Sequence, residues 1–424
     1  MVKINIDNIK IQYLPKYRFN MIEYTAHVYK DLIALYPAWA DLKTYLTSVE
    51  GGSLVISDSN DQFCIIRSKT SVTENGPSHM KWFRSTVWNI VENRPVSFAP
   101  TKANSHLCYT SCQELVNAGI FCQEFLDGFM INCFKYAGND ELYITTRSKL
   151  GGTGRFYSNK SFRELFLEAY AGNVNDLRGP DVTKGEYAVS YSFLAQHIEH
   201  HVVTPITQNK AVLIQKATFC EDGSMCVEDG FETFQDSPNI PVIPVEFEAD
   251  ETVDAWVSRF LSDKPWSYQG IVLKDAFGNR WRYRNELYMQ VKALRGNSAT
   301  HIERFAQLYR QNLIETYLQY YPLESYTFVC NNLFMNMIHQ TVYNYYVQLH
   351  ITKTITMNEI ELQYRRHVYS LHKYYIGTLR PLKKKITYNE VARYFFNLPW
   401  QVLAHLLRIS QDSYFSLMNE VVSQ

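Results

Sequence analysis

The chain has 424 residues, with 42 Lys and Arg against 42 Asp and Glu, so its formal net charge is zero. This length corresponds to about two to three domains and excludes a single small module. The neutral balance excludes the strongly basic composition of a protein that coats nucleic acid nonspecifically, so any contact with RNA must come from local patches. A hydrophobic share of 46% with 20% charged residues is typical of a globular chain.

The cysteines and the N-terminus bear on the compartment. Eight cysteines are spread along the chain without C-x-x-C spacing, and the first residues lack the basic start and apolar run of a signal peptide. We therefore expect a reducing, cytoplasmic location. No run approaches the roughly 18 apolar residues of a membrane span, so no membrane partner is expected.

Residues 1–79 are predicted to be an N-terminal lead-in packed on the core. A helix is expected from His27 to Leu46, interrupted at Pro37 because proline breaks helices. A short strand, Ser53 to Ser57, follows Gly51 and Gly52.

Residues 80–296 carry the pattern of an α+β core. Short β-rich runs are separated by a few helices, one of which opens with the capping-box spacing of Ser161 and Glu164. Another helix has Val253, Trp256, Val257 and Phe260 on one face. The expected strands are Ser85–Trp88, Val96–Phe98, Gly128–Phe134, Leu142–Thr146, Ala188–Ser192, Val202–Ile206, Ala211–Gln215 and Gly270–Leu273.

Two further segments complete the chain. Residues 220–244 contain paired Asp-Gly steps and three prolines, which predict a hairpin or a surface loop within the core. From residue 297 to 424 the β pattern nearly disappears, and amphipathic stretches broken at Pro322, Pro381 and Pro399 predict an all-α C-terminal domain.

Several short stretches carry candidate chemistry. Arg147 follows a strand, where a guanidinium can hold a ribose or a phosphate by paired hydrogen bonds. Arg280, Arg282 and Arg284 alternate along one predicted strand and therefore face one side, where they can meet phosphate; a solvated edge strand has the same pattern.

In their order, these stretches resemble the phage-type tRNA-repair RNA ligases, and more closely the RNA-ligase-like proteins of large DNA viruses. The resemblance covers roughly residues 80 to 420. It rests on Arg84-Ser85-Thr86-Val87-Trp88 with Lys102, Glu124 to Phe134, Thr145 to Phe156, Phe193 to Val203, Gln269 to Leu273, Arg282 to Arg284, Leu294 to Asn297, and two stretches between Leu371 and Thr387. It implies a nucleotidyltransferase (RNA/DNA ligase adenylation) core followed by the helical domain.

The same resemblance identifies what is missing. It places Phe125 where the family has a nucleophilic lysine, Leu194 and Gln269 where it has carboxylates, and Arg282 and Arg284 where it has lysines. Nucleophilic catalysis needs a lone pair, which Phe125 lacks, and an amide is a poorer ligand for Mg²⁺ than a carboxylate. We therefore expect no catalytic residue and no adenylation, and regard the chain as a pseudoenzyme.

A noncatalytic ligand site remains the expectation. If the family fold holds, its residues surround a cleft that binds RNA or a nucleotide without reacting; the alternative is a vestigial cleft filled by Phe125 and apolar neighbours. The candidates are Arg84, Lys102, Glu124, Asp127, Arg147, Gln269, Arg282, Arg284 and Lys292.

The sequence leaves three functions open. The first is an inactive RNA-ligase-like protein that binds RNA or nucleotide in RNA repair, protection or translation-linked recognition. The second is an active ligase that uses ATP and Mg²⁺ with a displaced lysine, for which Lys102, Lys135 and Lys149 are candidates. The third is a scaffold of a viral complex, in host cytoplasm or virion, that binds other proteins through the helical domain.

Two clusters have competing interpretations. The spacing of His197, His200 and His201 suggests a metal site, but core or solvated histidines are favoured, and no metal ligand is assigned. The run from Lys383 to Lys385, preceded by Arg365, Arg366 and Lys373, is either an RNA-backbone patch or a solvated turn.

Overall fold

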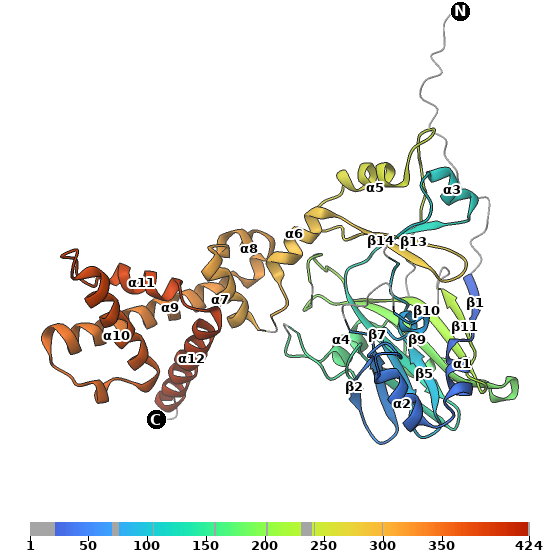
Figure 1. The fold of residues 1–424 in the computed structure, drawn as a ribbon, viewed down its shortest axis with the longest axis horizontal. Coiled ribbons are helices and arrows are strands. Elements are labelled where there is room, and N and C mark those ends of the chain that lie inside the picture. The colour runs from blue at the N-terminus through green and yellow to red at the C-terminus, as the bar shows by residue number, and fades with distance from the viewer. Residues whose placement is uncertain are drawn as a thin grey trace, which may run out of the picture. The chain divides into compact units, whose positions relative to one another are not determined.

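The computed structural model describes residues 22–69, 76–104, 106–156, 158–200, 202–229, 240, 242–298 and 300–422. The chain divides into two compact units between Gln290 and Val291. The first unit mixes sheets and helices and the second is helical (Figure 1), which confirms the predicted α+β class with a helical C-terminal region.

The described residues of the first unit form three sheets, and their strands pair antiparallel. Their strand orders are β1-β11-β10-β9-β7-β8, β12-β6-β13-β14 and β2-β3-β4-β5. The strands are β1 (Ile22–Ala26), β2 (Val55–Ser59), β3 (Phe63–Arg67), β4 (Thr86–Asn89), β5 (Arg94–Phe98), β6 (Phe121–Glu124), β7 (Phe129–Tyr136), β8 (Asn139–Thr145), β9 (Glu186–Gln196), β10 (Lys210–Cys220), β11 (Met225–Asp229), β12 (Val242–Ile243), β13 (Gly270–Lys274) and β14 (Arg280–Arg284).

Short helices flank these sheets. As predicted, the first helical stretch is interrupted at Pro37, and Ser161 and Glu164 form a reciprocal capping box that opens α4. The helices are α1 (Val28–Leu35), α2 (Trp39–Thr47), α3 (Cys112–Asn117), α4 (Phe162–Ala169) and α5 (Val253–Ser262), and α6 (Glu286–Arg295) spans the division between the units.

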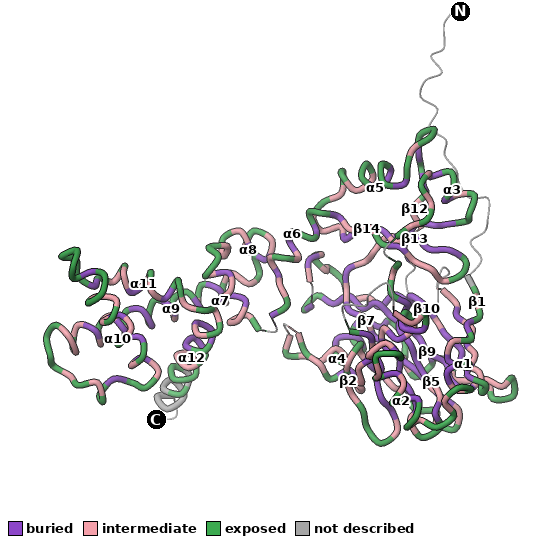
Figure 2. Tube along the Cα trace, viewed as in Figure 1, coloured by how far each residue is buried: buried purple, intermediate pink, exposed green. Residues whose placement is uncertain are grey.

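One face of the four-stranded sheet β12-β6-β13-β14 is packed in an apolar core. On the four-stranded sheet of β6, β13 and β14, Cys122, Ile271 and Trp281 join the apolar core that includes Leu115 of α3 and Trp256 of α5. Figure 2 shows how burial concentrates in the strands of this unit. Because alternate residues of a strand point to opposite faces, the other side of this sheet carries a different set of residues.

The second unit is built from helices around an apolar core. The 22-residue helix α9 buries Met335, Ile338 and Val342, and α10 buries Val368 and Leu371. Its remaining helices are α7 (His301–Gln311), α8 (Ile314–Tyr320), α11 (Tyr388–Phe396) and α12 (Trp400–Val422), with α9 at Ser325–Tyr346 and α10 at Leu362–Tyr374. No helix of the described residues is long and apolar enough to cross a bilayer.

The structure corrects one predicted strand. Residues 202–206 form no strand, because the backbone amides of Val203 and Thr204 donate to Oδ2 of Asp127, at 2.9 and 3.0 Å, instead of to a neighbouring strand. The predicted hairpin within residues 220–244 is formed by β10 and β11, which turn at Asp222 and Gly223. Residues 230–239 and 241 of that segment lie outside the described residues.

The lead-in joins the sheets directly. β1 pairs with β11 at the edge of the six-stranded sheet, and β3 pairs with β4 across residue 79. Residues before and after that point therefore share sheets and one apolar core.

Candidate functional site

Three arginines project from one face of β14. Arg284 lies opposite Gly270 of β13, and Arg282 lies opposite Val272. Arg280, two residues before Arg282, shares their face, whereas Trp281 points into the apolar core. The predicted alternation is therefore present in the strand.

The backbone at Gly270 fixes this register. Its φ is +144°, and a Cβ at this position would lie 2.0 Å from the carbonyl oxygen of Tyr283. Only glycine permits such close approach, so Gly270 lets β13 lie against the end of β14 that carries Arg284.

Arg84 and Arg147 join the arginines of β14 from other strands. Arg84 precedes β4, and its Nη1 donates to the carbonyl oxygen of Pro100 at 3.4 Å. Arg147 follows β8, and its carbonyl oxygen accepts from Oγ of Ser85 at 3.1 Å. Burial, and then repulsion from the four other arginines, lowers the pKa of Arg84 to about 10. We call Arg84, Arg147, Arg280, Arg282 and Arg284 the arginine cluster.

Asp229 and Asp275 line a small pocket together with Arg280, at one end of the arginine cluster. Among the described residues, none of its five members forms an ion pair with Asp or Glu. Arg67 lies close enough to lower the pKa of Arg147 further, after burial. The buried Nε atoms of Arg67 and Arg284 have no hydrogen-bond partner among the described residues. Like charges gathered in this way favour an anion that accepts hydrogen bonds.

Phe125 lies beside this cluster. Its backbone amide donates to the carbonyl oxygen of Gly270 at 2.9 Å, which extends β6 along β13. The guanidinium carbon of Arg284 lies 5.8 Å from the centre of the Phe125 ring, which is half-buried. The predicted nucleophile position therefore presents an aromatic face that can stack on a planar group, and no lone pair.

Gln123 is a residue that the sequence did not single out. It lies opposite Val272 and therefore shares the face of Arg282. Its side chain is 1% exposed, and both amide atoms lack a partner among the described residues. The sequence contained a signal for this, because Gln123 precedes Phe125 by two residues and alternation along a strand places both on one face.

Glu124 and Asp127 do not join the arginine cluster. Glu124 lies opposite Ile271, on the other face of the sheet, where burial raises its pKa against the opposing effect of Lys210 and Lys264. The Oδ2 atom of Asp127 accepts the two backbone amides of the 203–204 loop. These contacts give Asp127 a structural role.

Four further positions were singled out in the sequence, namely Lys102, Leu194, Gln269 and Lys292. The backbone of Gln269 accepts from the amide of Asn285 at 3.1 Å, and Lys102 is exposed after β5. Lys292 belongs to the second unit. Leu194, where the resemblance implies a carboxylate, packs in an apolar cluster with Val212, Ile214 and Ile240 and, at its edge, Leu126 and Met130.

Two candidate displaced lysines are engaged elsewhere. Nζ of Lys135 donates to the carbonyl oxygen of Asn175 at 2.8 Å, and Lys149 pairs with Asp58 at 3.8 Å. Lys274 is buried, and burial lowers its pKa while Asp229 raises it. Its ammonium contacts both carboxylate oxygens of Asp229, at 2.7 and 2.8 Å, so it is held as an ion pair.

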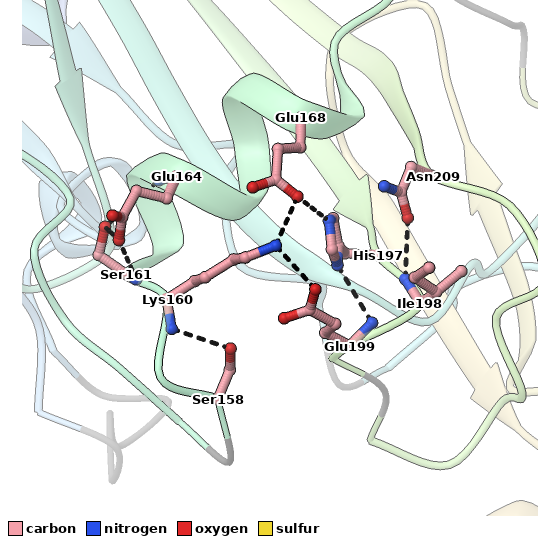
Figure 3. A network of polar contacts seen from close by, with 9 residues as sticks. All are labelled: Ser158, Lys160, Ser161, Glu164, Glu168, His197, Ile198, Glu199 and Asn209. Carbon is pink, nitrogen blue, oxygen red and sulfur yellow. Dashed lines mark hydrogen bonds and ion pairs between the residues drawn. The ribbon is translucent and has the colours of Figure 1, made fainter.

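A separate polar network contains His197 (Figure 3). Nζ of Lys160 donates to Glu168 at 2.9 Å and to Glu199 at 2.7 Å. Nε2 of His197 lies 2.9 Å from the same Glu168 oxygen, and Nδ1 of His197 accepts from the amide of Glu199 at 3.1 Å. Glu168, His197 and Glu199 are the described residues whose spacing could suit a metal ion.

The hydrogen bonds argue against a metal in this network. Because Nδ1 of His197 accepts a backbone proton, Nε2 carries the ring proton and donates it to Glu168. Neither nitrogen then offers a lone pair, and the ammonium of Lys160 already supplies the positive charge between the carboxylates. His200 instead lies against the rings of Phe129 and Phe162, 5.1 and 5.4 Å between centroids. His201 lies outside the described residues.

Comparison with known proteins gives one viral similarity. No protein-family model matches the chain. Over 261 residues the chain is 24% identical to a protein described as "Immediate-early protein ICP-46 homolog" from Invertebrate iridescent virus 3. The match covers 57% of this chain and 54% of that protein, so the chain matches about half the length of this curated relative. The chain is thus similar to a viral protein.

Proposed function

We propose that this protein is an RNA-ligase-like protein that binds RNA or a nucleotide through the arginine cluster and does not transfer an adenylate. The observation that supports this proposal best is that Arg84, half-buried, lies among four other arginines and forms no ion pair with a carboxylate of the described residues. Gathering these charges is unfavourable, although solvent screens the exposed Arg147 and Arg282, and a ligand that supplies negative charge relieves the repulsion. Phosphate groups match guanidinium in charge and hydrogen-bonding geometry.

Two neighbours favour a nucleotide unit over an inorganic anion. Phe125 offers a half-buried aromatic face against which a base can stack. Gln123 holds an amide donor and an amide acceptor that lack partners among the described residues. A buried amide of this kind is costly unless it is satisfied, and a base edge presents both a donor and an acceptor.

The proposed protein does not transfer an adenylate, because its residues do not supply that chemistry. Phe125 has no lone pair, Leu194 lies in an apolar cluster, and Lys135 and Lys149 are engaged by other groups. ATP and Mg²⁺ are thus cofactors of the alternative, an active ligase, and not of the function proposed here.

An adduct assay tests the inactive against the active alternative. The full chain is incubated with α-labelled ATP and Mg²⁺ or Mn²⁺, then denatured, and covalent AMP is sought on the protein. We expect none. A stable adduct would establish a nucleophile and overturn the pseudoenzyme proposal.

A binding titration tests the ligand. Fluorescence anisotropy with a short single-stranded RNA should show affinity that falls steeply as salt rises, because phosphate contacts release counterions. The variant Arg282→Ala/Arg284→Ala should lose at least tenfold in affinity. The matched control Arg178→Ala removes an exposed arginine that pairs with Glu186 at 2.8 Å, and should bind RNA as the unchanged protein does.

The scaffold alternative predicts another outcome. Tyr326, Val329, Leu333 and Met337 are exposed at helical spacing on α9, which supports contact with a partner protein. If the unchanged protein binds no RNA even at low salt, the scaffold function is favoured and RNA binding is rejected.

A further inference from the structure

The helical unit differs in charge from the rest of the chain. Residues 291–424 contain 14 Lys and Arg against 8 Asp and Glu, although the whole chain is neutral. A charge asymmetry between parts of a chain is typical of proteins whose basic part meets a polyanion. Seven of these 14 cations lie between Arg365 and Lys385.

A line of cations follows α10 and the π-helical turn Tyr375–Leu379. Arg366 and Lys373 are exposed and seven residues apart on α10, so they share one face of that helix, and Arg380 is exposed directly after the π-helical turn. Tyr369 lies between Arg366 and Lys373 on that face and is 65% exposed, and Ile376 in the π-helical turn is 50% exposed. From Arg366 to Lys373 this face spans about 10 Å.

The opposite face of α10 packs in the apolar core. Tyr364, His367, Val368 and Leu371 are buried there. The orientation of the helix is thus fixed by packing, and its cationic face is held outward.

A structured turn continues this line of charge. The amide of Lys384 donates to the carbonyl oxygen of Leu379 at 2.9 Å, and Lys383 adopts a left-handed φ of +54°. Leu379 and Ile386, at the two ends of the turn, are buried. The turn therefore presents Lys383, Lys384 and Lys385 from fixed anchors, and all three are exposed.

We call Arg366, Lys373, Arg380, Lys383, Lys384 and Lys385 the basic stripe. None of the six forms an ion pair with any described residue. The nearby Glu390 instead contacts Arg393 at 3.3 Å and accepts from the hydroxyl of Tyr374 at 3.3 Å.

We propose that the basic stripe is a second RNA-binding surface, which contacts the phosphate backbone without reading its sequence. Cations on a rigid element position phosphates, and the exposed ring of Tyr369 can stack on an unpaired base. An anionic membrane is the less favoured ligand, because the apolar face of α10 is buried and only scattered apolar residues remain outside. This surface is separate in sequence and in folding unit from the arginine cluster.

The test compares salt dependence in the full chain. A labelled oligouridylate is titrated at several KCl concentrations with the unchanged protein and with Lys373→Glu/Lys384→Glu/Lys385→Glu. For a single strand each phosphate contact contributes roughly 0.7 to the slope of log K against log salt, so the slope should become shallower by about 2. Affinity at low salt should fall at least tenfold.

Two controls distinguish the loss of contacts to the basic stripe from a general change in net charge and from unfolding. Arg310→Glu/Lys353→Glu changes exposed cations of the same unit outside the stripe, and should alter affinity less than twofold. The neutral variant Lys373→Gln/Lys384→Gln/Lys385→Gln repeats the measurement without added negative charge. Both stripe variants should keep the thermal unfolding midpoint, since the three side chains are exposed.

The binding results that test the basic stripe differ from those that test the arginine cluster. An unchanged slope in both stripe variants overturns the proposal, even if Arg282→Ala/Arg284→Ala weakens binding. Loss of binding to vesicles containing phosphatidylserine, with RNA binding retained, also overturns it and identifies a lipid surface. A shallower slope in the stripe variants supports it, whether or not the arginine cluster binds RNA.

Discussion

Replacing Arg84 by methionine should stabilise the protein while weakening its ligand binding. Burial and the four neighbouring arginines lower the pKa of Arg84 from 12.5 to about 10. Because the unfolded chain keeps the higher pKa, the charged form is disfavoured in the fold by about 3 kcal/mol at every pH well below 10. Methionine keeps an apolar side chain of similar length and removes the charge.

The net effect is smaller than this penalty. The substitution also loses the 3.4 Å hydrogen bond from Arg84 to Pro100, which contributes roughly 1 kcal/mol. We therefore expect the free energy of unfolding to rise by about 1 to 2 kcal/mol, measured by urea denaturation without ligand. RNA affinity should fall at least tenfold, because the cation at the centre of the arginine cluster is gone.

Arg178→Met is the control for Arg84→Met. Arg178→Met removes an arginine that makes two hydrogen bonds with Glu186, at 2.8 and 2.9 Å, so it should leave stability equal or slightly lower and RNA binding unchanged. If Arg84→Met destabilises the protein and binds RNA normally, Arg84 serves packing, and the electrostatic interpretation of the cluster is wrong.

Three further predictions concern other parts of the chain. Burial lowers the pKa values of His339 and His367 from 6.5 to about 4. Because the unfolded chain binds these protons more readily, the helical unit should lose stability as pH falls below 6.5, by about 2 kcal/mol per histidine at pH 5. His339→Leu should make this pH dependence weaker in denaturation curves recorded from pH 7 to 5. Gly270→Ala should destabilise the first unit by about 3 kcal/mol or more, as followed by thermal unfolding, because its Cβ would lie 2.0 Å from the Tyr283 oxygen; an unchanged midpoint would contradict the close approach. Phe125→Lys should form no AMP adduct with labelled ATP, since the positions at 194 and 269 hold no carboxylate, and robust ligation by this variant would show that the rest of the site is competent.

Local signals in the sequence determined much of the architecture. The capping box at Ser161, the helix break at Pro37 and the alternation of Arg280, Arg282 and Arg284 each depend on neighbours within a few residues, and each is present in the structure. The segment 202–206 was predicted wrongly because its amides bond to Asp127, a residue some 76 positions earlier. Strand propensity alone does not contain such a partner.

The membership of the candidate site was decided by tertiary structure. The resemblance grouped Glu124 and Asp127 with Phe125, since all three belong to one four-residue stretch of the chain. Pleating sends Glu124 to the opposite sheet face, and loop contacts engage Asp127. Conversely, β6 pairs with β13 and β13 pairs with β14, and this places Gln123 on the face of Arg282. Residue types and periodicity are local properties, whereas which charges share a cluster depends on strand register between segments more than a hundred residues apart.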